Sequence, residues 1–158
     1  MVIKNLKPLG LLLLIGAFAS CNNDDYIASN ESDYLIFGHF YGMCVGESCV
    51  ETFMLTDTSL LEDTKDDYTG KEFNFKKLSN SKFEQVKDLP DFLPNQLVNE
   101  KDSIFGCPDC ADAGGLFVQY SENGNVKSWR IDQVKANVPE YLHNFMDKVN
   151  EEIALVNN

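Results

Sequence analysis

The chain has 158 residues and a formal net charge of −12 at pH 7, from 13 basic and 25 acidic side chains. Nucleic acid and anionic membrane surfaces repel such a charge, so nucleic acid is excluded as an expected partner. With 44% hydrophobic and 11% aromatic residues, the composition is not that of a disordered chain, and the length suits one domain with a buried core.

The chain begins with a short basic segment that is followed by an apolar run. Lys4 and Lys7 precede the apolar residues 9–19, and the run ends in small residues and a cysteine, Ala19-Ser20-Cys21. This order of charged start, apolar segment and small-residue cleavage site is typical of a secretory signal. The apolar run is shorter than the about 20 residues that a transmembrane helix needs.

The segment Phe18-Ala19-Ser20-Cys21 resembles the lipobox of bacterial lipoproteins, with Phe18 where a branched aliphatic residue is usual. The resemblance implies lipid transfer to the Cys21 thiol, cleavage before Cys21 and acylation of the new amino terminus. Two or three acyl chains anchor a protein stably, because each buried CH2 contributes about 0.8 kcal/mol. The alternative is an ordinary secretory signal in which the cysteine is incidental.

The sequence therefore divides into three parts. Residues 1–20 are assigned to the signal peptide, residues 21–33 to a lipidated flexible tether, and residues 34–158 to a single domain. The tether is polar and acidic without periodicity, and Asn22-Asn23-Asp24-Asp25 is similar to the export tag of surface-facing lipoproteins in some Gram-negative bacteria. These resemblances imply an envelope protein of the outer membrane, exposed on the surface, whose partner is the membrane through acyl chains on Cys21.

Two segments at the start of the domain predict a β-hairpin. Residues 34–43 are aromatic-rich and interrupted by glycine, which favours a strand, and residues 49–56 form the second strand after a four-residue turn. This register predicts the cross-strand pairs Cys44–Cys49, Phe40–Phe53 and His39–Met54. A cysteine pair would then close the tip of the hairpin.

Carboxylates dominate the next segment, residues 57–71. They belong to Asp57, Glu62, Asp63, Asp66 and Asp67. Calcium binds several carboxylate oxygens, but the spaced pattern of an EF-hand is absent. We favour a solvated connection with a short strand at residues 59–62. Residues 72–78 alternate in polarity and predict a half-buried strand.

Two helical segments are expected in the middle of the chain. Residues 79–87 predict a short helix capped by Asn80 or Ser81, and Pro94 starts a further turn that reaches Val98. Near the carboxyl end, Asn137-Val138-Pro139-Glu140 predicts the start of a longer helix. Its apolar stripe consists of Leu142, Phe145, Met146, Val149 and Ile153.

The strongest turn signal of the chain is Asn123-Gly124, because a type I′ turn needs positive φ at both central residues. It lies between two predicted strands, residues 116–121 and 126–132. The register places Val118 opposite Trp129 and Leu116 opposite Ile131 on the core face, and Phe117 and Arg130 on the other face. The predicted fold is α+β: a small antiparallel sheet of four to five strands, with two hairpins, and a carboxyl-terminal amphipathic helix packed on it.

Four cysteines in the domain are the main candidates for chemistry. They form CxxxxC and CxxC pairs at Cys44, Cys49, Cys107 and Cys110. In an oxidising compartment, four cysteines suggest two disulfides with three possible connectivities. The hairpin geometry favours a local Cys44–Cys49 bond. Disulfides that join the two segments remain an alternative, because a disulfide that closes a long loop stabilises the fold by about 4 kcal/mol and one that closes a short loop by about 2 kcal/mol.

Two other uses of these cysteines are considered. One is an all-cysteine zinc site that uses the four side chains as thiolates, against which the oxidising compartment argues. The other is thiol–disulfide exchange, because Cys107-Pro108-Asp109-Cys110 is similar to the CPxC motif of glutaredoxin-like proteins. No βαβ pattern surrounds the motif, and Asp109 and Asp112 would raise a thiol pKa.

No enzymatic constellation stands out in this sequence. GxSxG, HExxH and P-loop motifs are absent, and His39 and His143 are expected to be packed or exposed residues. We therefore expect a lipid-anchored envelope protein that acts by binding or as a structural module, without a cofactor. An extracytoplasmic redox protein and a zinc-binding lipoprotein are the alternatives.

Overall fold

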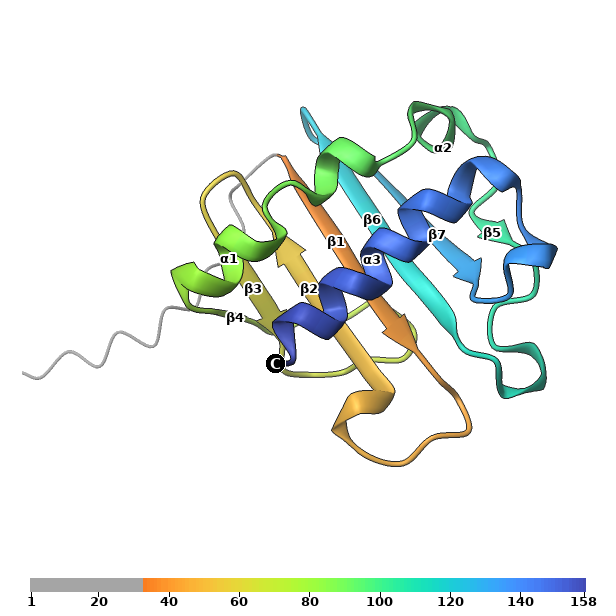
Figure 1. The fold of residues 1–158 in the computed structure, drawn as a ribbon, viewed down its shortest axis with the longest axis horizontal. Helices are drawn as coiled ribbons and strands as arrows, with labels where there is room; N and C mark the ends of the chain where they lie inside the picture. Colours follow the sequence, from red (N-terminus) through yellow and green to blue (C-terminus); the bar gives the residue numbers. More distant parts are fainter. Residues whose placement is uncertain (1–32) are drawn as a thin grey trace, which may run out of the picture.

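A mixed β-sheet with helices across one face forms the domain (Figure 1). The computed structural model describes residues 33–158, so the predicted signal peptide, Cys21 and residues 22–32 of the tether lie outside the described residues. The strands are β1 (Tyr34–Phe40), β2 (Val50–Leu55), β3 (Leu60–Asp63), β4 (Phe75–Lys77), β5 (Ile104–Phe105), β6 (Gly115–Glu122) and β7 (Asn125–Asp132). The helices are α1 (Asn80–Val86), α2 (Asn95–Asn99) and α3 (His143–Val156).

The α+β class is confirmed, but the sheet is larger than predicted. It has seven strands in the order β4-β3-β2-β1-β6-β7-β5, where four to five were expected. It is also mixed, because β5 runs parallel to β7. Of the two outermost strands, β4 lies within the predicted strand of residues 72–78 but has only three residues. Strand β5 was not predicted, because its two residues carry too little alternation to be recognised.

The second hairpin has the predicted register. Val118 pairs with Trp129 and Leu116 with Ile131, and all four side chains are buried. Asn123 and Gly124 both have positive φ, at 51° and 78°, as the turn requires. The turn chemistry and the alternation agree here, which is why the sequence is sufficient to give the register.

The register of the first hairpin is wrong in the prediction. Phe37, not Phe40, pairs with Phe53, and His39 pairs with Glu51. The connection is longer than a four-residue turn, since Tyr41 N–H donates to the Cys49 carbonyl at 2.9 Å and Glu47–Cys49 is a 3-10 turn. A shift by an odd number of residues exchanges the faces, and it brings Phe37 and Phe53 into the main core with ring centroids 5.6 Å apart.

Helix α3 covers the sheet and buries the predicted stripe. Phe145, Met146, Val149 and Ile153 are all at most 3% exposed, and Leu142 just before the helix is fully buried. The helix begins at His143, later than predicted, because 3-10 turns at Lys135–Asn137 and Glu140–Leu142 precede it. None of the helices within residues 33–158 has the length and apolarity to cross a membrane.

The capping prediction for the first helix is wrong. Ser79 occupies the N-cap position of α1 and makes no side-chain capping bond, whereas Asn80 and Ser81 lie inside the helix. The further turn after Pro94 is present as α2. Both short helices bury one apolar residue each, Val86 and Leu97, so packing against the core and not capping determines their position.

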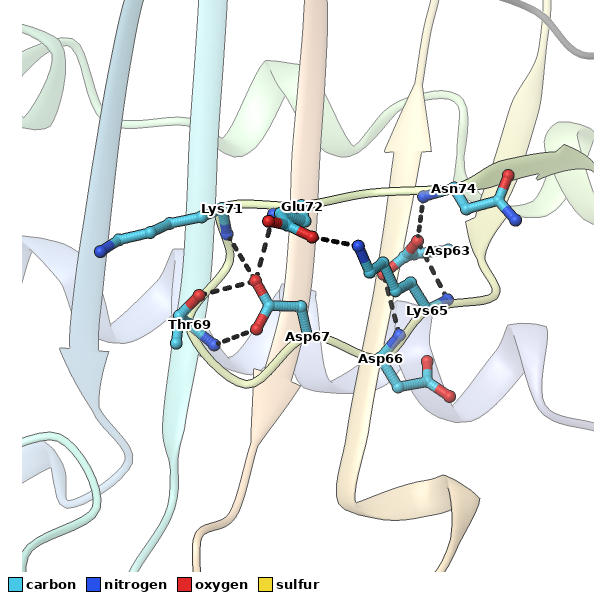
Figure 2. A network of polar contacts seen from close by, with 8 residues as sticks. All are labelled: Asp63, Lys65, Asp66, Asp67, Thr69, Lys71, Glu72 and Asn74. Carbon is cyan, nitrogen blue, oxygen red and sulfur yellow. Dashed lines mark hydrogen bonds and ion pairs between the residues drawn. The ribbon is translucent and has the colours of Figure 1, made fainter.

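The opposite face of the sheet is covered by a loop, residues 64–74, which we call the strap. Beneath it lies a second apolar cluster of Ile36, Phe40, Val50, Met54, Leu61 and Phe117. Figure 2 shows the strap crossing in front of the strands. Gly70 has φ +65°, and a Cβ there would lie 2.7 Å from the Phe117 ring, so the backbone contacts this ring directly.

Two carboxylates hold the strap in shape (Figure 2). Asp63 accepts hydrogen bonds from the backbone amides of Lys65, Asp66 and Asn74. Asp67 accepts the Thr69 hydroxyl at 2.6 Å and the amides of Thr69, Lys71 and Glu72. These bonds, led by that from the Thr69 hydroxyl, hold the pKa of Asp67 well below its usual range. The acidic segment is thus a connection after a short strand, as favoured, and its carboxylates bind backbone amides.

Substitution of Gly38 by alanine tests the packing of β1 against β2. An added Cβ would meet the Glu51 carbonyl oxygen and lie 2.8 Å from Thr52 Cα. We expect Gly38→Ala to lower the free energy of unfolding by about 1–3 kcal/mol in chemical denaturation, because backbone atoms cannot yield as side chains do. Ser128→Ala, at an exposed position of β7, is the control and should change it by less than about 0.5 kcal/mol. Equal stability of the two variants would contradict the close approach.

Candidate functional site at the disulfide end of the sheet

The four cysteines of the domain form two local disulfide bonds. Cys44 is bonded to Cys49 with a Cα–Cα distance of 5.6 Å, and Cys107 to Cys110 with a Cα–Cα distance of 5.4 Å. The favoured Cys44–Cys49 pairing is therefore present, and bonds between the two segments are not. Because β1 ends at Phe40, Cys44 lies within the connecting loop and not at the tip of paired strands.

Both disulfide loops lie at one end of the sheet. Phe40 at the end of β1 pairs with Gly115 at the start of β6, so the loop that follows β1 and the loop that precedes β6 are neighbours (Figure 1). Gly114 is buried with φ +73°, and a Cβ there would collide with the Tyr41 ring. Glycine at this position lets the two loops make close contact. We call this region the disulfide end: residues 41–49 and 107–114, with Tyr68 and Arg130.

Asp109 links three segments at the disulfide end. Its Oδ2 accepts the Gly42 amide at 2.8 Å and the Tyr68 hydroxyl at 2.9 Å, and its Oδ1 accepts the Gly114 amide at 3.1 Å. Asp109 has φ +64°, a left-handed conformation that aspartate adopts more readily than most residues. The aspartate of the CPDC motif therefore ties the second loop to the first loop and to the strap.

Arg130 holds the strap against the sheet beside Asp109. Its guanidinium lies 3.6 Å from the centroid of the Phe40 ring and 5.0 Å from that of Tyr68, and it donates to the Tyr68 carbonyl at 2.9 Å. Burial, followed by the hydrogen bond to Asp109, raises the pKa of the Tyr68 hydroxyl, although Arg130 opposes the shift. Arg130 thus acts as a packing cation between two aromatic rings.

The surface around the first loop is hollowed and apolar. A cavity of 630 Å³ is lined by Tyr41, Met43, the Cys44–Cys49 bond and Tyr68, among others. Met43 and Val45 are 80% and 101% exposed, the largest values among the exposed apolar side chains of residues 33–158. Large apolar side chains held out in solvent by a cross-linked loop are a common feature of protein contact surfaces.

A buried carboxylate supports the CPDC loop from behind. Asp132, 1% exposed, accepts the amides of Cys107 and Val134 and the Asn137 side-chain amide, at 2.7–3.0 Å. Burial alone would raise the pKa of Asp132, but these three hydrogen bonds outweigh it, so that the pKa lies below its usual value. The carboxylate therefore stays charged and fixes the start of the loop.

The structure bears on the other uses considered for the cysteines. A four-thiolate zinc site needs sulfurs that are here joined in disulfides, and no group of three or more His, Cys, Asp and Glu side chains within residues 33–158 is arranged to hold a metal ion. The Cys107–Cys110 bond is exposed, as exchange requires. However, a three-residue 3-10 turn with left-handed residues follows it, where glutaredoxin-like proteins activate the thiol with a helix.

Both histidines have structural contacts. His39 lies on the helix-covered face, with Nε2 3.0 Å from the Ser48 carbonyl and 3.4 Å from the Glu51 carboxylate. His143 Nε2 lies 2.9 Å from the Lys135 carbonyl at the start of α3. The His39 imidazole borders the disulfide end, because it contacts Ser48 and packs against the Tyr41 ring at a centroid distance of 5.2 Å. Both histidines are thus packed residues, which is one of the two roles expected of them.

No protein-family model matches the chain, and no curated protein is similar to it. The site is therefore interpreted from its own geometry.

Sequence reasoning identified the cysteines but not the residues that join their loops. From the sequence, Asp109 is expected only to raise the pKa of a neighbouring thiol, and Tyr68 is only one residue of the acidic connection 57–71. The sequence does contain one signal for this contact, Gly114-Gly115, which is separated from Cys110 by three residues. Adjacent glycines indicate that the backbone approaches another segment closely.

Two substitutions of Asp109 separate its hydrogen bonds from its backbone conformation. Asparagine tolerates positive φ and keeps one acceptor, whereas alanine removes all acceptors. We expect Asp109→Ala to increase the hydrogen-exchange rate of the Gly42 amide about tenfold or more. Asp109→Asn should increase this rate by a smaller factor.

The same variants predict a change at alkaline pH. A raised Tyr68 pKa stabilises the fold below the ordinary value of 10.0, and this contribution is lost as pH rises through the folded-state pKa. Asp109→Asn should therefore lower the Tyr68 pKa in an NMR titration of the ring, so that the alkaline loss of stability is smaller and is complete at a lower pH. An unchanged Tyr68 titration would contradict the assigned contact.

Proposed function

We propose that this chain is a lipid-anchored cell-envelope protein whose domain acts by binding, with the disulfide end as its contact surface. The observation that carries the proposal is the pair of local disulfides in a domain that follows a lipobox-like segment. Disulfides persist in oxidising compartments outside the cytoplasm. A lipid on Cys21, with the tether before Asp33, would hold the domain at the outer membrane.

The position of the disulfide end supports a role as contact surface. The chain enters the domain at Asp33, directly before β1, and the first disulfide loop follows the other end of that strand. Seven extended residues span roughly 20 Å. A domain anchored through residues before Asp33 would thus carry Met43 and Val45 on the end remote from its attachment.

Thiol–disulfide exchange at Cys107 and Cys110 is the second candidate. The exposure of both residues favours it, and the absence of a following helix argues against strong activation of either thiol. The zinc-binding alternative has no comparable support, because it needs both disulfides to be reduced.

Anchoring is tested at Cys21. We expect the wild-type protein to incorporate an alkyne-labelled palmitate in cells and to enter the detergent phase in a phase split, because two or three acyl chains dominate its partitioning. Cys21→Ser should lose the label completely, whereas Ser20→Ala, one residue away, should keep it. Label retained in Cys21→Ser, or a mature protein cleaved elsewhere, contradicts the lipoprotein assignment.

The chemical state of the four domain cysteines distinguishes the binding, zinc-binding and redox hypotheses. We expect no reaction with maleimide in denaturant before reduction and four reactive thiols afterwards, measured by intact mass. Thiols that become reactive when a chelator is added would instead indicate zinc. Catalysed exchange with a small dithiol that Cys107→Ser abolishes and Cys44→Ser leaves intact would favour the redox function over binding.

A further inference from the structure

A second cavity lies at the end of the sheet opposite to the disulfide end. It has a volume of 390 Å³ and lies between the strand ends and the segment that runs from α1 to the 3-10 turn Leu89–Phe92. Cavities of about 300–1,000 Å³ suit small ligands or a single long side chain. We call it the amino-end pocket, because β1 begins beside it.

The floor of the amino-end pocket is apolar and aromatic. Leu35 pairs with Leu55 on one side and with Tyr120 on the other, so three neighbouring strands place these side chains in a row on the helix-covered face. Phe83 from α1 lines the pocket from the helix side. Phe83 and Tyr120 are only partly buried, so part of each aromatic ring stays available to a ligand.

The rim of the pocket is strongly acidic. Four carboxylates line it, from Asp33, Asp57, Asp88 and Glu122, and all four residues are exposed. The single lysine among the lining residues, Lys87, already pairs with Glu84 at 2.9 Å. The pKa of the Tyr120 hydroxyl is raised by burial, then by Glu122 and Asp33, which places these negative charges close to the ring.

We propose that the amino-end pocket binds a primary ammonium group carried on an apolar stem. The carboxylates complement the ammonium charge, the leucine floor suits the stem, and the Tyr120 and Phe83 rings offer faces for a cation. The ligand is a free amine or the lysine side chain of a peptide, which share this chemistry. An anionic ligand is excluded by the unneutralised charge on the rim.

The test is an NMR titration of the detergent-solubilised full chain with three probes. n-Butylammonium chloride represents the free amine, the peptide acetyl-Gly-Lys-Gly-amide represents the lysine side chain, and 1-butanol is the neutral control. We expect saturable shifts of the Leu35, Leu55 and Tyr120 amides with at least one cationic probe, weakened by added salt. 1-Butanol should bind at least about threefold more weakly, since it lacks the charge.

Charge-neutral variants complete the test. The double variant Asp88→Asn with Glu122→Gln removes two rim charges at exposed positions. It should weaken binding of the cationic probe about threefold or more. Asp102→Asn with Glu140→Gln removes two exposed charges that do not line the pocket and should leave binding unchanged. The proposal is overturned if neither cationic probe gives saturable shifts, if 1-butanol binds equally well, or if both double variants bind alike. A response to one cationic probe alone supports it and identifies the source.

Discussion

The pairing of β1 with β2 on one side and β6 on the other is the interaction on which the rest of the structure depends. This pairing fixes which face each large apolar side chain of β1 occupies: Leu35 and Phe37 enter the core under α3, and Ile36 and Phe40 enter the cluster under the strap. Because the neighbours are antiparallel, the ends of β1 also gather the loops of both partners. One end carries the two disulfide loops, and the other carries the acidic pocket beside Asp33.

Carboxylates provide much of the order outside the regular elements. Asp63 and Asp67 shape the strap, Asp109 ties the disulfide loops together, and Asp132 fixes the start of the CPDC loop. Each accepts backbone amides that no strand or helix satisfies, and a charged acceptor makes such a bond stronger than a neutral one does. Some of the acidic side chains therefore stabilise the structure, in addition to their effects on solubility and on the choice of partners.

The predictable part of the fold is the part in which local signals agree. Asn123-Gly124 and the alternation around it give the register of β6 and β7, and the stripe from Leu142 to Ile153 gives the buried face of α3. The prediction of the register fails for the first hairpin, because its loop is closed by a disulfide and a 3-10 turn, and no turn residue fixes the length of the loop. The cysteines of the site were predictable, but Asp109, Tyr68 and Arg130 come from three distant segments and meet only through the sheet order.

The two ends of β1 differ in chemistry, because the charged side chains at each end have different surroundings. At the disulfide end, Asp109 accepts three hydrogen bonds and Arg130 packs against two aromatic rings, and Met43 and Val45 are the most exposed large apolar side chains of residues 33–158. At the amino end, the carboxylates of the rim, among them Asp57 and Asp88, belong to exposed residues, so the rim presents negative charge to solvent. An apolar surface remote from Asp33 favours contact with a protein, whereas an acidic aromatic pocket beside Asp33 favours a cation. The two proposed sites therefore differ in the ligand chemistry that they would select, and they lie at opposite ends of β1.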